Sequence, residues 1–180
     1  MDYTEAQNII PKFGDFTIDN VQFNVRRSDF DQSVNNLSNV TSTTKLNEIV
    51  ASGDLAHARL LSGNDNRYTF EKNQLSALKD DISNQLNKNV EFAGFFWYPS
   101  GAYCGWHTNS NNTGERHYLV WAEESGKSFF RYKDPDTEEI VTNWDQSGWQ
   151  VRNFTASETN PTWHCVGSET NRISIGFVVR

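Results

Sequence analysis

Two histidines and a residue beside one of them form the pattern in this chain that points most directly to chemistry. His107 begins the tripeptide His107-Thr108-Asn109, and alternation along a strand would place the first and third side chains on one face. His164 lies in a second strand-like segment. Two imidazoles suit iron, zinc, copper or nickel, and a third ligand would complete a face that leaves coordination positions open. His107, Asn109 and His164 are therefore the predicted metal ligands and catalytic residues.

The third position of this set holds an amide, where a carboxylate would bind a divalent ion more strongly. The carbonyl oxygen of Asn109 can bind a metal, but it adds no negative charge. Deamidation of Asn109, a substitute such as Glu115, or a site of two histidines alone remain alternatives. Asn109 also begins a polar turn with Asn111 and Asn112, in which short amides bond their own backbone, and this interpretation has equal weight.

Arg172 and Ser174 follow the second histidine and are expected on one face of a strand. Apolar side chains alternate with them, at Ile173, Ile175 and Phe177. Arg172 therefore faces either solvent or the cavity of a barrel, and in a barrel the polar face would line a pocket.

Short segments rich in aromatic and β-branched residues fill the second half of the chain. They cover residues 90–96, 116–122, 128–132, 139–141, 149–154, 162–166 and 172–179. Turn signals such as Pro99-Ser100-Gly101 and Asp134-Pro135-Asp136 separate them. Short strands at near-regular spacing, with no helix between them, predict an antiparallel barrel or jelly roll.

The first half of the chain is expected to supply helices that pack on this sheet structure. Residues 68–86 are the clearest helix, because leucine and isoleucine recur there at three and four residues. Residues 44–61 predict one or two short helices, residues 16–25 one or two strands, and residues 35–44 a polar loop. The predicted fold class is mainly β with N-terminal helices.

Composition narrows the classes of partner. A formal charge of −7 and a pI near 5.0 oppose binding to nucleic acid, and no basic patch offsets them. The sequence begins without a cationic segment followed by an apolar run, and it has no long apolar stretch, so we expect a soluble, cytoplasmic protein that does not enter a membrane.

Cys104 and Cys165 are interpreted as incidental buried thiols, ahead of a disulfide or a zinc pair. The oligomeric state is not predicted.

Several segments occur in the order found in one enzyme family. They are Tyr98-Pro99-Ser100-Gly101, His107-Thr108-Asn109, Arg116 before His117-Tyr118-Leu119-Val120-Trp121, Ser128-Phe129-Phe130 before Asp134-Pro135, Trp149-Gln150-Val151-Arg152-Asn153-Phe154, Trp163-His164-Cys165-Val166 and Arg172-Ile173-Ser174-Ile175-Gly176-Phe177. From about Phe96 onward the chain resembles the double-stranded β-helix core of the iron(II)/2-oxoglutarate oxygenases, especially the prolyl-hydroxylase-like branch. The length suits one domain over residues 1–180, with strands and packing helices in 1–89 and a jelly-roll, cupin-like core in 90–180.

The resemblance implies that His107 and His164 hold iron(II), with Asn109 in place of the usual Asp. The aspartyl-hydroxylase-like branch of that family works with two histidines and no carboxylate ligand. The implied activity is oxidative decarboxylation of 2-oxoglutarate to succinate and CO2, coupled to hydroxylation of a peptidyl side chain or a small metabolite.

The resemblance also implies a site for 2-oxoglutarate as cosubstrate. Arg172 would form a bidentate pair with its distal carboxylate, a contact that a planar guanidinium makes well. Ser174 would donate a second hydrogen bond, and Tyr98 or Tyr118 a further one.

Two other functions remain open. One is a non-catalytic ligand-binding module that kept the barrel and lost the metal-binding carboxylate at Asn109. The other is a cupin-like metalloenzyme that uses the histidines and a cysteine without 2-oxoglutarate, which leaves Arg172 and Ser174 unexplained. His57 and His117 are interpreted as structural, whereas Trp106 and Trp163, each next to a proposed ligand, are expected to touch the substrate or shield the metal.

Overall fold

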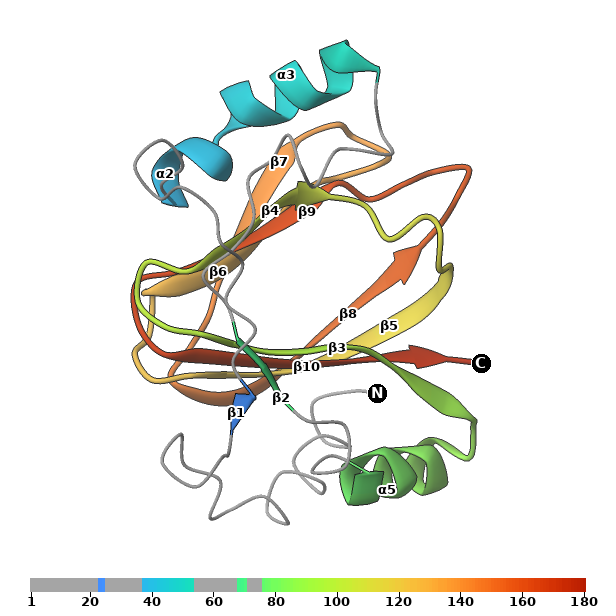
Figure 1. Cartoon of the computed structure of the whole chain (residues 1–180). Helices are drawn as coiled ribbons and strands as arrows, with labels where there is room; N and C mark the ends of the chain where they lie inside the picture. The colour runs from blue at the N-terminus through green and yellow to red at the C-terminus, as the bar shows by residue number, and fades with distance from the viewer. Residues whose placement is uncertain (1–22, 25–36, 54–67, 71–75) are drawn as a thin grey trace.

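Two antiparallel sheets face one another in the computed structural model, which describes residues 23–24, 37–53, 68–70 and 76–180 (Figure 1). The larger sheet has the order β1 (Phe23–Asn24), β2 (Tyr68–Phe70), β3 (Val90–Tyr98), β10 (Arg172–Val179), β5 (Gly114–Ala122) and β8 (Gly148–Ala156). The smaller sheet has the order β4 (Tyr103–His107), β9 (His164–Ser168), β6 (Ser128–Lys133) and β7 (Ile140–Trp144).

From β3 onward the chain passes back and forth between the sheets. β4, β6, β7 and β9 lie in the smaller sheet, and β3, β5, β8 and β10 lie in the larger one. This arrangement is a double-stranded β-helix, so the predicted fold class, mainly β with a jelly-roll core and N-terminal helices, is confirmed. The predicted single domain and its division near residue 89 stay predictions.

Helix α5 (Ser76–Leu86) covers the outer face of the larger sheet (Figure 1). Leu78 and Ile82, spaced four residues apart on one helix face, are buried there. They pack against the apolar residues of β10, namely Ile173, Ile175 and Phe177. The alternation predicted for β10 therefore holds, and the alternate residues Arg172 and Ser174 face the interior between the sheets.

Helix α3 (Thr43–Ser52) lies over the outer face of the smaller sheet, next to the short helix α2 (Leu37–Val40). The side chain of Ser42 caps α3 by accepting a hydrogen bond from the backbone N–H of Lys45 (3.1 Å). Gly53 ends the helix in the left-handed conformation, at φ 69°. Leu46 and Ile49 face a buried cluster that contains Trp106, Phe129, Trp163 and Cys165.

Four predictions for the first half of the chain need correction or extend beyond the described residues. The predicted helix over 68–86 is wrong at its start, because Tyr68–Phe70 form strand β2 and pair with β3. Aromatic and β-branched side chains at 68–70 fit a pleated sheet edge better than a helix. The loop predicted over 35–44 contains α2. Residues 16–22 and 54–61 lie outside the described residues.

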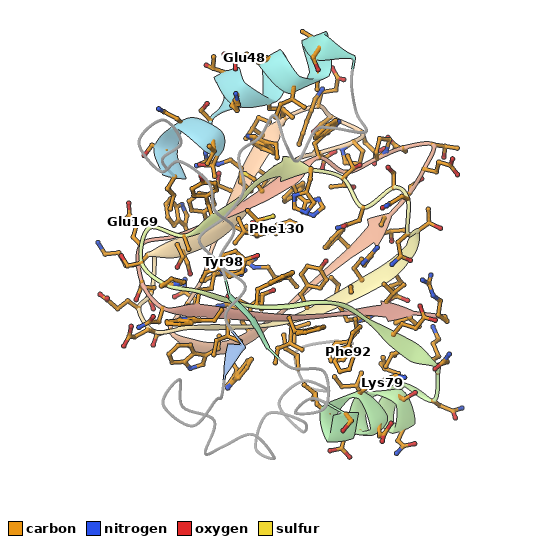
Figure 2. The ribbon with its side chains drawn as sticks, viewed as in Figure 1. Glu48, Lys79, Phe92, Tyr98, Phe130 and Glu169 are labelled. Carbon is orange, nitrogen blue, oxygen red and sulfur yellow. The ribbon has the colours of Figure 1, made fainter. Side chains whose placement is uncertain are left out.

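The space between the sheets is filled mainly by aromatic side chains. Tyr98 and Phe130 point into it from opposite sheets, whereas Phe92 lies on the α5 side of β3 (Figure 2). Cys104 belongs to this inner cluster and Cys165 to the outer one, and both are buried and form no disulfide within the described part of the chain. Among the helices that the structure describes, none combines the length and the apolar character needed to cross a membrane.

Candidate metal and ligand site

Strands β4 and β9 bring the two histidines face to face. His107 is the last residue of β4, His164 is the first of β9, and the two are paired in the register of the smaller sheet. Their ring centroids lie 4.2 Å apart. Directly opposed residues of antiparallel strands share one face of the sheet, so both imidazoles point toward the interior.

Both imidazoles have the same tautomer, set by the backbone. Nδ1 of His107 lies 2.8 Å from the carbonyl oxygen of Gly105, and Nδ1 of His164 lies 2.9 Å from that of Thr162. A carbonyl oxygen can only accept, so each Nδ1 carries the hydrogen and each Nε2 presents a lone pair. Metal-bound histidines are oriented in this way in most sites.

Asn109 lies beside this pair, as its spacing from His107 predicted. Its Nδ2 donates a hydrogen bond to Nε2 of His164 across 3.1 Å. A half-turn of the amide plane exchanges Oδ1 and Nδ2 and would place the carbonyl oxygen there instead. Two ligand atoms about 3 Å apart fit one ion at bonds of about 2.1 Å at right angles. Asn109 and His164 could therefore hold one ion as an amide oxygen and an imidazole, and the ring of His107 faces that of His164.

Cys104 is close to the histidines, and it lies nearest to the Nδ1 side of the His107 ring. Its Sγ lies 3.6 Å from Nδ1 of His107, the nitrogen that faces the backbone. A metal bound through Nε2 would lie across the ring from this sulfur. No group of three His, Cys, Asp or Glu side chains suited to a metal occurs among the described residues.

A cavity of about 100 Å³ adjoins the three residues. Hydroxyl-bearing side chains from the larger sheet contribute to its lining, namely Tyr98, Tyr118 and Ser174. Gly176 makes room for Tyr118, because a β-carbon at position 176 would lie 2.4 Å from Cε1 of that ring. The predicted cosubstrate residues Ser174, Tyr98 and Tyr118 thus line one cavity with His107, Asn109 and His164.

Arg172 is not among the residues that line this cavity. It is buried, its guanidinium carbon lies 5.4 Å from the ring centroid of Tyr98, and its Nε donates to Oδ2 of Asp145 at 2.8 Å. Its Nη1 is buried and has no hydrogen-bond partner in the part of the chain that the structure describes. Arg172 therefore lies behind the residues that line the cavity, and its Nη1 has no hydrogen-bond partner among the described residues.

Asp145, just after β7, was not predicted. Its carboxylate also accepts hydrogen bonds from Arg152 and from Oγ of Ser128 (2.7 Å). Burial alone would raise the pKa of Asp145, but the charges of Arg172 and Arg152 lower it from 3.8 to about 2. One carboxylate between two arginines leaves one positive charge uncompensated. No local pattern marks Asp145 in the sequence, since only the tertiary fold brings it to Arg172.

Three sequence interpretations are settled by position. Glu115 is half-exposed and does not line the cavity, so it cannot replace a metal ligand. His117 instead pairs with Glu115 at 2.9 Å, and its interpretation as a structural residue holds. Trp106 and Trp163 pack in the outer cluster under α3, and Nε1 of Trp106 donates to the carbonyl of Ser42. The prediction that these two tryptophans touch a substrate or metal is wrong, because side chains next to an inward-facing residue point outward. His57 lies outside the described residues.

Comparisons with known proteins give likeness of fold at low identity. No protein-family model and no curated protein matches the chain. Among solved structures, a prolyl-4-hydroxylase from Pseudomonas putida is 19% identical over 60% of this chain and 59% of its own, with a TM-score of 0.40. A prolyl hydroxylase from Trichoplax adhaerens is 14% identical over 79% of this chain and 78% of its own, with a TM-score of 0.44. The match thus spans less than two thirds of the Pseudomonas enzyme.

Proposed function

We propose that this chain is a non-haem iron(II)- and 2-oxoglutarate-dependent oxygenase that hydroxylates a peptidyl side chain or a small metabolite. Iron(II), 2-oxoglutarate and O2 together supply the oxidation, in which one oxygen atom enters a substrate C–H bond and the other enters succinate, with release of CO2. The observation that carries the proposal is the convergence of His107, His164 and Ser174 on one cavity, with each Nδ1 held by a backbone carbonyl so that each Nε2 carries the lone pair.

In this proposal the histidines bind the ion through Nε2. Their Nδ1 hydrogens are already held by the carbonyls of Gly105 and Thr162, so the rings need no reorientation on binding. Asn109 serves as a neutral third ligand through its amide oxygen. The set has no anionic member, so its affinity for iron(II) should be lower than that of a set with a carboxylate.

The cosubstrate would be held from the larger sheet. The hydroxyl of Ser174 donates to a carboxylate in the cavity, with Tyr98 and Tyr118 as further donors. Arg172 does not line the cavity, so in this proposal it contributes its positive charge from behind Tyr98. Asp145 already compensates part of that charge, so we expect Arg172 to strengthen 2-oxoglutarate binding less than an arginine without an acidic partner would.

The first experiment titrates metal-stripped protein with iron(II) and then 2-oxoglutarate under anaerobic conditions, and measures succinate after oxygen is admitted. Iron-dependent 2-oxoglutarate binding and succinate formation are expected in the wild type. His107→Ala and His164→Ala should each abolish both. His117→Gln is the matched control, because it removes an imidazole outside the cavity and should retain turnover. Turnover in both alanine variants would overturn the proposal.

The alternative is a non-catalytic ligand-binding module on the same barrel. It is favoured by the amide at Asn109 and by the compensation of Arg172 by Asp145. It predicts that ligands bind equally well with and without metal and that no succinate forms.

A cupin-like enzyme that does not use 2-oxoglutarate is a further alternative. Arg172→Ala distinguishes it from an oxygenase, because this variant should raise the apparent KM for 2-oxoglutarate strongly in an oxygenase and should leave a cupin-like activity unchanged.

A further inference from the structure

A second and larger cavity, of about 360 Å³, lies between β7 and β8, each the last strand in the order of its sheet. Its volume is in the range of cavities that hold small organic ligands. The residues that line it come from both sheets and from the segments before β7 and β9, and they include Phe130, Tyr132, Asn143, Arg152, Phe154 and Thr162. We call it the edge cavity.

The edge cavity adjoins the histidine site through aromatic rings. Phe130 lines both cavities, and its ring centroid is 5.3 Å from that of His164. Phe154 lies 5.1 Å from the same imidazole and 5.5 Å from Phe130. The carbonyl oxygen that orients His164 belongs to Thr162, which also lines the edge cavity. A ligand there would lie one aromatic layer from His164.

Charge in the edge cavity favours an anion. Arg152 is the charged residue among those that line it, and no carboxylate of the described residues does so. Arg152 shares Asp145 with Arg172, so this buried group of three carries one positive charge in excess. The aromatic wall of Phe130, Tyr132 and Phe154 offers apolar contact to a flat ligand body. A guanidinium beside aromatic rings is suited to a carboxylate on an apolar molecule.

We propose that the edge cavity binds a small carboxylic acid with a flat apolar body and that Arg152 pairs with its carboxylate. This binding needs neither a metal nor 2-oxoglutarate, so it does not depend on the function proposed above.

The test uses metal-stripped full-length protein without 2-oxoglutarate. The probes are benzoate, phenylacetate and 3-phenylpropanoate, each compared with its neutral amide by calorimetric titration at pH 7. We expect at least one acid to bind about tenfold or more tightly than its amide, as a charge-assisted pair requires. This comparison needs no variant. Equal affinity for acid and amide, or no binding of any acid at millimolar concentration, would overturn the proposal.

Two variants locate the contact. Arg152→Gln leaves Asp145 paired with Arg172 and should reduce the preference for the acid to about twofold or less, with binding of the amide unchanged. Arg180→Gln removes an arginine at the far end of β10 that is bound to Glu91, and it should keep the full preference. Loss of the preference in both variants would mean a general charge effect and would contradict a contact at Arg152.

A further readout separates the edge cavity from the proposed cosubstrate site. Saturating 2-oxoglutarate should leave the acid bound, and displacement of the acid would assign the probe to the cosubstrate site and overturn the edge cavity as a separate site.

Discussion

At the scale of single residues, the side chain at position 109 decides how strongly the histidine pair can bind a divalent ion. Asn109 occupies the place that the spacing from His107 predicts, and it contacts Nε2 of His164. Its side-chain amide lies beside Nε2 of His164 and adds no charge to the interior. A carboxylate in the same place would add the charge that a divalent ion favours.

Asn109→Asp should therefore tighten the binding of manganese(II), a redox-stable substitute for iron(II), by about tenfold or more, because it places a negative charge next to the ion. Calorimetric titration of metal-stripped protein measures the change. Asn111→Asp is the matched control, since it adds the same charge to an exposed position of the adjacent turn, and its manganese affinity should change little. Equal gains in the two variants would show that Asn109 is not a ligand.

At the scale of elements, strand β10 separates two environments along its length. Its odd-numbered residues from Ile173 to Phe177 pack under α5, and its even-numbered residues face the interior. Gly176 lies opposite Tyr118 in the register of the sheet and opposite Gly94 on the other side. The missing side chain at 176 gives the ring of Tyr118 its place over the strand.

Gly176→Ala should displace that ring and lower the free energy of unfolding by about 1–3 kcal/mol, the usual cost of overpacking. It should also weaken 2-oxoglutarate binding to the metal-loaded protein, because Tyr118 lines the cavity. Gly167→Ala is the control, since its added β-carbon meets Phe129 on the outer face, at 2.6 Å from Cζ. Denaturant unfolding should show a loss of stability in both variants, whereas calorimetry should show weaker 2-oxoglutarate binding in Gly176→Ala alone. Unchanged 2-oxoglutarate affinity in Gly176→Ala would remove Tyr118 from the site.

At the scale of the whole molecule, Asp145 joins the two sheets. It follows β7 of the smaller sheet and accepts from Ser128 of β6, and it pairs with Arg152 of β8 and Arg172 of β10 in the larger sheet. All four groups are buried or nearly so. Removal of the carboxylate would leave two arginines without their anionic partner, which is the costly way to break a buried ion pair.

The folded protein should therefore lose stability in acid through Asp145. Its pKa in the fold is about 2, below the ordinary 3.8, so the carboxylate stabilises the fold above pH 3.8 and this contribution is lost as pH falls from 3.8 toward 2. The loss amounts to about 2 kcal/mol at 1.36 kcal/mol per pKa unit. Asp145→Asn should be less stable at pH 7 by about 3 kcal/mol or more, and should have a flatter pH dependence in that window.

Denaturant unfolding of both proteins at a series of pH values measures this difference. Asp136→Asn, which removes an exposed carboxylate from the turn before β7, is the control and should follow the wild type. An Asp145→Asn protein with the stability and acid response of the wild type would show that the two sheets do not depend on this network.

By itself, the sequence determined the properties that depend on neighbours along the chain. Alternation in β10 predicted which side chains face inward, because the period of a strand is a local property. The spacing of His107 and Asn109 predicted that both reach one site, and both line one cavity, although β4 ends at His107 and Asn109 lies in the loop that follows. Periodicity likewise located α5, although its start was misplaced where an edge of β3 was open to pairing. The order of segments predicted the jelly roll.

Only the tertiary structure decided which distant residues meet. Strand register set His107 opposite His164, and the packing of two sheets brought Asp145 to Arg172, which lie 27 positions apart. It also turned Trp106 away from the site, toward α3. Register and sheet packing depend on pairing between strands far apart in the sequence, and no local pattern encodes such pairing. The compensation of Arg172, the size of the two cavities and the place of Arg152 therefore followed from the fold alone.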